Sequence, residues 1–287
     1  MVGRYATNHD SLAAIVDDML VHENLVDRVI EAFSRFIKRV EFDTAKNIVE
    51  NKLFFEAADL WEKFSQGVGA TCIEQAEMLE SLLRNGGIDC QIVHADVTDV
   101  RQQALKFAFI SLVHVPVNED RWMLLDPVRK TYYDCNSSGG AWTGNGEVQF
   151  VTSADNEYTF DRYVRGEVVW RVRVDRNLPR GFRRERLRRL VEELNGVSPY
   201  GFIAPLFAEE HHERAIFFDP YAEEVLLRQG AETYRLDVAD WERDSKCAWL
   251  GSRVEKVWPA IKQMRSAPPQ AYADMQTKMQ GEFFQRL

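Results

Sequence analysis

One cysteine of this chain stands where a thiol could act as a nucleophile. Cys72 follows a glycine-rich loop and precedes an apolar-periodic run, and the Thr71-x-x-Glu74 pattern around it is typical of a helix N-cap. Free N–H groups and the positive end of the helix dipole favour a thiolate in a first turn, so we expect a lowered pKa for Cys72. Such a thiolate could attack an acyl carbonyl. Ordinary packing is the alternative, because free cysteines are among the most often buried residues.

The elements around Cys72 follow from the spacing of the apolar residues. Residues 10–64 carry three amphipathic runs, which predict a helical N-terminal unit. The helix headed by Cys72 is expected to end at Asn85-Gly86-Gly87, because these residues tolerate a positive φ. Beyond it the apolar residues alternate, and this predicts strands over 88–97, 106–117 and 121–128.

The second half of the chain is predicted to be rich in strands. Residues 135–147 are expected to form a Gly- and Ser-rich loop, after which we expect strands over 157–175 and between 213 and 238, a basic helix over 181–195 and a terminal helix over 252–264. This order indicates an α+β protein with an N-terminal helical bundle, a Cys-headed helix on an antiparallel sheet, and a β-rich second half with a C-terminal helix. The expected divisions are 1–66, 67–150 and 151–287.

The composition narrows the class of protein. The 287 residues carry a net charge of −9, which argues against a general binder of nucleic acid or anionic membranes. No apolar run approaches the ~20 residues that span a bilayer, and the N-terminus has no leader of the signal-peptide type, so we expect a cytoplasmic protein. The four cysteines form no C-x-x-C pair, so we expect free thiols and no zinc site.

Two stretches carry a resemblance to a known group of enzymes. "GATCIEQAEMLESLLRNGGIDCQIV" (69–93) and "FISLVHVPVNEDRWMLLDP" (109–127) resemble the transglutaminase-like superfamily, whose members carry a Cys at a helix start, a His on one strand and an Asp on the next. Within it the layout is most similar to that of the arylamine N-acetyltransferases, whose late Ser-Pro-Phe stretch is like "NGVSPYGFIAPL" (195–206). These enzymes move an acyl group from coenzyme A to an arylamine or hydrazine through a Cys thioester, and biosynthetic relatives close amides from carrier-bound chains.

The resemblance implies a catalytic role for three residues. Cys72 would attack the acyl thioester, His114 would act as the base, and Asp126 would orient His114. The histidine of the family, however, falls on Ser111 here. A shift of three residues on a regular strand changes the face to which a side chain points, so His114 can serve only if a bulge or a shorter hairpin restores its direction. His94 is the reserve base, and a remodelled or inactive relative is the remaining alternative.

The arginines that follow residue 179 form the one concentrated basic patch. Arg183, Arg184 and Arg188 are the candidates for binding the phosphates of coenzyme A or an acidic carrier protein. The alternative is a solvated helix face paired with neighbouring glutamates. His211-His212 lies in a polar stretch that groups no further ligands, so a solvated turn is expected there, and no metal site.

The sequence therefore predicts a cysteine-dependent acyltransferase that uses acyl-CoA or an acyl-carrier-protein thioester as co-substrate and a small-molecule amine as acceptor, with no permanently bound cofactor. Two alternatives stay open. One is a transglutaminase-like amidase or peptidase, in which water or a peptide amine resolves the same intermediate. The other is a non-catalytic binding relative in which the family histidine is replaced.

Overall fold

The computed structural model divides the chain into two compact units. The first comprises Met1–Val40 and Phe55–Arg180, and the second comprises Glu41–Phe54 and Gly181–Leu287. The structure describes residues 15–16, 21–50, 56–65, 69–99, 108–127, 130–136, 140–143, 148–154, 157–164, 167–175, 206–209, 214–219, 222–229 and 232–266. This division differs from the expected one, because the strands up to Asp175 pair with the central strands.

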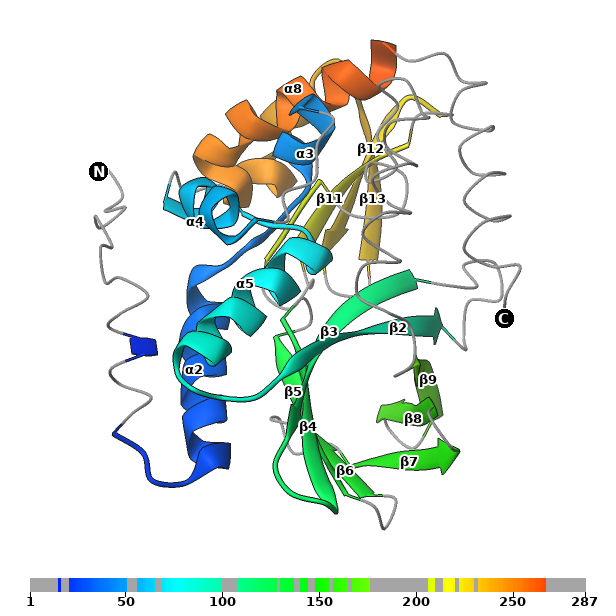
Figure 1. The fold of residues 1–287 in the computed structure, drawn as a ribbon. Helices are drawn as coiled ribbons and strands as arrows, with labels where there is room; N and C mark the ends of the chain where they lie inside the picture. The colour runs from blue at the N-terminus through cyan, green and yellow to red at the C-terminus, as the bar shows by residue number, and fades with distance from the viewer. Residues whose placement is uncertain are drawn as a thin grey trace. The chain divides into compact units, whose positions relative to one another are not determined.

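The first unit contains a closed antiparallel barrel (Figure 1). Its strands follow one another in chain order, and the last pairs with the first: β2 (Gln91–Asp99), β3 (Ala108–Pro116), β4 (Arg121–Asp126), β5 (Thr131–Asn136), β6 (Gly140–Thr143), β7 (Val148–Ala154), β8 (Glu157–Val164) and β9 (Glu167–Asp175). The prediction that residues 135–147 form a loop is wrong in one respect, because the strand β6 lies within this range. The Gly- and Ser-rich composition of that segment gives no local signal for a strand. A pattern in the sequence reports the types of the side chains, whereas a short strand depends on its pairing partner.

Alternating residues of the strands face the inside of this barrel and form a core. The core joins apolar side chains of five strands: Val93, Ala95, Leu112, Trp122, Leu124, Tyr133, Cys135, Val172 and Val174. The intervening residues Val113, Val115 and Leu125 belong to the opposite, outer face, yet none of their surface is exposed. Helix α5 (Cys72–Asn85) packs on β2 and β3 and covers this part of the outer face.

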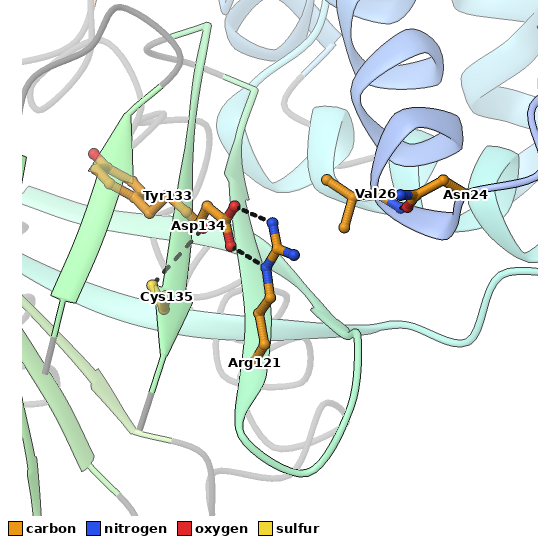
Figure 2. Close-up of polar contacts among 6 residues, drawn as sticks. All are labelled: Asn24, Val26, Arg121, Tyr133, Asp134 and Cys135. Carbon is orange, nitrogen blue, oxygen red and sulfur yellow. Dashed lines mark hydrogen bonds and ion pairs between the residues drawn. The ribbon is translucent and has the colours of Figure 1, made fainter. Parts of the chain in front are cut away.

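Two further helices and a side-chain network complete the first unit. Helices α2 (Leu25–Arg39) and α4 (Ala57–Ser65) pack on α5. Asn24 caps α2, since its Oδ1 accepts from the N–H of Val26 at 2.8 Å. Between β4 and β5, Arg121 donates to both oxygens of Asp134 at 2.9 and 2.6 Å, and Figure 2 shows this bidentate pair. The pair links β4, the strand that ends at Asp126, to β5.

The second unit is a five-stranded antiparallel sheet with helices. The strand order is β1 (Phe42–Asp43), β10 (Phe207–Glu209), β11 (Arg214–Asp219), β12 (Glu224–Gln229) and β13 (Glu232–Asp237). Helix α3 (Ala45–Glu50) packs on α8 (Val254–Ser266), and the 3₁₀ segments η2 (Trp241–Arg243) and η3 (Ser245–Arg253) precede α8. The predicted C-terminal helix is thus confirmed, while α3 belongs to this unit and not to an N-terminal bundle. The α+β class is confirmed. None of the described helices has the length and apolar character needed to cross a membrane.

Candidate active site

The local structure at Cys72 is the predicted capping box. Oγ1 of Thr71 accepts from the N–H of Glu74 at 3.4 Å, and the N–H of Thr71 donates to Oε2 of Glu74 at 2.9 Å. Both capping residues are buried. Helix α5 therefore begins at Cys72, whose backbone lies in the first turn, where N–H groups have no intrahelical acceptor.

Cys72 differs from the other cysteines in exposure, though its pKa is not lowered. It is partly exposed, whereas Cys90, Cys135 and Cys247 are buried. Burial of the sulfur raises the pKa of the Cys72 thiol from 9.0 to about 12; backbone hydrogen bonding from Ile73 opposes this, and the Asp126 carboxylate adds to it. The expected lowering of this pKa is therefore wrong: desolvation and nearby negative charge outweigh the helix terminus. At neutral pH the thiol is protonated and needs a base before it can react.

The structure brings Asp126 close to Cys72. Asp126 is the last residue of β4, pairs with Thr131 and is fully buried. Its charge lies near enough to raise the pKa of the thiol. Two of the three residues that the resemblance implied are thus neighbours, although they come from a helix and a strand more than fifty residues apart in the sequence. The orienting role of Asp126 stays a prediction.

Ser111, and not His114, is the residue of β3 that adjoins Cys72. Backbone hydrogen bonding from Ser111 lowers the pKa of the Cys72 thiol, and Ser111 is fully buried. His114 pairs with Leu124, a residue of the barrel core, so His114 belongs to the inner face of β3. The three intervening steps along the strand also move its Cα about 10 Å from that of Ser111.

The bulge that His114 would need is absent from the described part of β3. Pairing with β2 continues without a shift from Gln91–His114 to Val97–Ala108, and pairing with β4 is regular from Val113 to Pro116. The structure therefore does not bring His114 toward Cys72. The reserve histidine has a different place: His94 of β2 is the direct partner of Ser111 in the ladder.

Two further predictions concern other parts of the chain. Arg183, Arg184 and Arg188, with the expected basic helix over 181–195, lie outside the described residues. Within the residues that the structure describes, no three His, Cys, Asp or Glu side chains gather where they could hold a metal ion.

Comparison with known proteins places the fold. No family model matches the sequence, and no curated protein matches it either. Solved structures match in fold: the arylamine N-acetyltransferase of Mycobacterium abscessus has a TM-score of 0.60 at 12% identity, covering 88% of this chain and 94% of that chain. The fold is that of the arylamine N-acetyltransferases.

Two other structures of this fold extend the comparison. The arylamine N-acetyltransferase from Salmonella typhimurium has a TM-score of 0.54 at 10% identity, covering 93% of this chain and 98% of that one. The Mycobacterium marinum enzyme in complex with CoA has a TM-score of 0.56 at 12% identity, covering 89% and 98%. The arylamine N-acetyltransferase-like fold expected from the sequence is confirmed. Identities this low establish the fold alone, so the activity has to be argued from the residues of this chain.

Proposed function

We propose that this protein transfers an acyl group from a thioester of coenzyme A or a carrier protein to a small-molecule amine, through an acyl-enzyme on Cys72. The observation that supports this most is the placement of Cys72. This residue is partly exposed and heads α5, and its thiol has the Asp126 carboxylate and the backbone of Ser111 as neighbours. The CoA complex of a structural neighbour supports coenzyme A as the donor class.

The chemistry would proceed in two half-reactions. The sulfur of Cys72 attacks the thioester carbonyl, and N–H groups at the start of α5 stabilise the oxyanion. The donor thiol leaves, and an amine then attacks the acyl-enzyme, which gives ping-pong kinetics. Because burial raises the pKa of Cys72 to about 12, a base must take its proton in the first step. No permanently bound cofactor is needed.

The remaining roles are also proposals. Arg183, Arg184 and Arg188 would bind the phosphates of the donor. His114 as the base stays a prediction, which the register of β3 disfavours. A cytoplasmic location likewise stays a prediction. A transglutaminase-like amidase or peptidase would use the same Cys72, so the preferred acyl donor, thioester or peptide amide, separates the two reactions.

Intact mass after incubation with a panel of acyl thioesters tests the proposal. The protein should gain the mass of one acyl group, and peptide mapping should locate it on Cys72. Cys72→Ala should abolish the adduct, whereas Cys247→Ala, which removes a buried thiol of the second unit, should retain it. Acylation of another residue, or of none, would contradict the proposal.

One observation favours a non-catalytic binding relative instead. Ser111 occupies the position where the family carries its histidine, and the Cys72 thiol has a raised pKa. Such a protein would bind an acyl thioester without forming an adduct. Binding of coenzyme A by calorimetry, together with an unchanged intact mass, would identify this case.

A further inference from the structure

We infer that Gln75 is a positioning residue for acyl transfer, because it holds both of the peptide groups that lead into Cys72. Its side chain binds the carbonyl of Ala70, and its main-chain N–H binds the carbonyl of Thr71. The inference rests on the proposed acyl transfer through Cys72. It adds a residue that fixes the direction of the main-chain N–H of the nucleophile.

The first of the two peptide groups joins Ala70 to Thr71. Nε2 of Gln75 donates to the carbonyl oxygen of Ala70 at 2.9 Å. At the other end of the same peptide group, the N–H of Thr71 donates to Oε2 of Glu74 at 2.9 Å. A peptide group is planar, so hydrogen bonds at its two ends fix its rotation. Two side chains of α5 therefore hold the peptide group that precedes the helix.

The second peptide group joins Thr71 to Cys72 and carries the N–H of the nucleophile. The N–H of Gln75 donates to the carbonyl oxygen of Thr71 at 2.8 Å, as the first main-chain hydrogen bond of the helix. The C=O and N–H of a trans peptide point in opposite directions. The N–H of Cys72 therefore points away from the body of α5.

The capping box determines which donors of the first turn face outward. Four N–H groups at the start of a helix have no acceptor within the helix. In α5 the capping box binds the first and the last of them, those of Thr71 and Glu74. The two between them belong to Cys72 and Ile73, and the N–H of Ile73 hydrogen-bonds with the sulfur. The N–H of Cys72 is thus the main-chain donor suited to the negative oxygen that forms when the thiol attacks a carbonyl.

Burial makes the Gln75 side chain hard to replace. Ala70 is 2% exposed and Gln75 is 1% exposed, so water does not reach this carbonyl in place of the amide. Without the amide, the Ala70 carbonyl can regain a donor only if its peptide group rotates. Such a rotation would displace the peptide groups that follow, and a displacement of about 1 Å at a reacting group costs about 10²-fold in rate.

Two reactions of the same thiol distinguish positioning from stability. Iodoacetamide alkylates the sulfur at a methylene carbon and releases iodide, so no oxyanion forms. With p-nitrophenyl acetate or acetyl-CoA, the sulfur bonds to the carbonyl carbon, and p-nitrophenolate or the CoA thiolate departs from the tetrahedral oxyanion. The thiol proton passes to the departing group or to the buffer. Loss of a positioning residue should slow acylation and spare alkylation, whereas loss of the fold should change both.

The experiment measures both rates on Cys72 by intact mass and peptide mapping, with circular dichroism to check the fold. Gln75→Met keeps the length of the side chain without its donor, and it should be acylated about 10–10²-fold more slowly than the wild type, with alkylation within about twofold. Gln75→Asn is one methylene shorter and should show the same split. The control Gln229→Met removes the same kind of bond, from Nε2 to the Lys246 carbonyl at 2.9 Å in the second unit, and should leave both rates unchanged.

The outcomes separate this inference from the proposed function. An acylation rate that is unchanged in Gln75→Met, or that falls in step with alkylation, would overturn the inference. If Gln75→Met lacks the circular dichroism of the wild type, the same split in Gln75→Asn decides. If the ester acylates Cys72 but no thioester does, the ester still tests Gln75, whereas the proposed donor is wrong. If neither acylates wild-type Cys72, the proposed function and the inference both fail.

Discussion

Removing the Glu74 side chain should destabilise the first unit and test how the nucleophile is held. Oε2 of Glu74 accepts from the N–H of Thr71 at 2.9 Å, and both residues are buried. In Glu74→Ala this N–H loses its acceptor away from water, which costs about 1–3 kcal/mol of the free energy of unfolding. Glu74→Gln keeps an acceptor oxygen, so it should cost about 1 kcal/mol or less, chiefly the charge at the helix N-terminus.

The other half of the capping box should matter less. The contact from the Glu74 N–H to Oγ1 of Thr71 is long, at 3.4 Å, so Thr71→Val should cost about 0.5 kcal/mol, the low end for an N-cap. Urea titrations followed by circular dichroism would give each free energy of unfolding. The control is Glu31→Ala, which removes a half-exposed ion pair with Arg35 and should cost about 0.5 kcal/mol.

Glu74→Gln should weaken the helix cap slightly but make the Cys72 thiol more reactive. The Glu74 charge raises the pKa of Cys72, so Glu74→Gln should lower this pKa and speed alkylation at a fixed pH below 9. Each unit by which the pKa falls gives about tenfold more thiolate. If Thr71→Val cost more than Glu74→Ala, or if Glu74→Gln slowed alkylation, the argument from the capping geometry would be refuted.

Three further predictions concern the core, the donor and alkaline pH. Leu124→Ala, which opens a cavity in the barrel core, should cost about 2–5 kcal/mol in the same urea titration, and a smaller loss would mean that the barrel collapses around the gap. Replacing Arg183, Arg184 and Arg188 with Gln should raise KM for acetyl-CoA and leave kcat nearly unchanged, and a lowered kcat at constant KM would contradict donor binding. Burial raises the pKa of Cys135 from 9.0 to about 12, so the unfolded thiol releases its proton first. Stability should therefore fall above pH 9, by up to about 1.4 kcal/mol per pH unit for this thiol. Cys135→Ala should flatten the dependence, and an unchanged slope would be evidence against it.

Sequence patterns predicted the elements that have a strong local signal. The capping box at Thr71 and the alternation of apolar residues in β2, β3 and β4 depend on neighbours along the chain, and these predictions are confirmed. The short strand β6 is recognised only by its pairing with β5 and β7, and the place of α3 in the second unit depends on α8, which lies far along the chain. A single sequence carries little information on such pairings.

The residues of the candidate site were also harder to predict, because their positions depend on strand pairing. The order Cys72, His114, Asp126 contains the right residue types, but the face to which a strand residue belongs depends on the register with β2 and β4. That register places Ser111 beside the thiol and His94 opposite Ser111. The raised pKa of Cys72 could not be predicted from the sequence either. The helix terminus is a local feature, whereas the burial of the sulfur and the nearby charge of Asp126 arise from tertiary packing.

A chase of the acyl-enzyme with an amine tests acyl transfer most directly. Cys72 would first be acetylated with acetyl-CoA, the free donor removed, and an arylamine or hydrazine added while intact mass is followed. The account predicts that the acetyl group leaves Cys72 at a rate proportional to the amine concentration, with one N-acetyl product formed for each group lost. Loss to water at the same rate with and without amine, or an acetyl group that stays on Cys72, would contradict it.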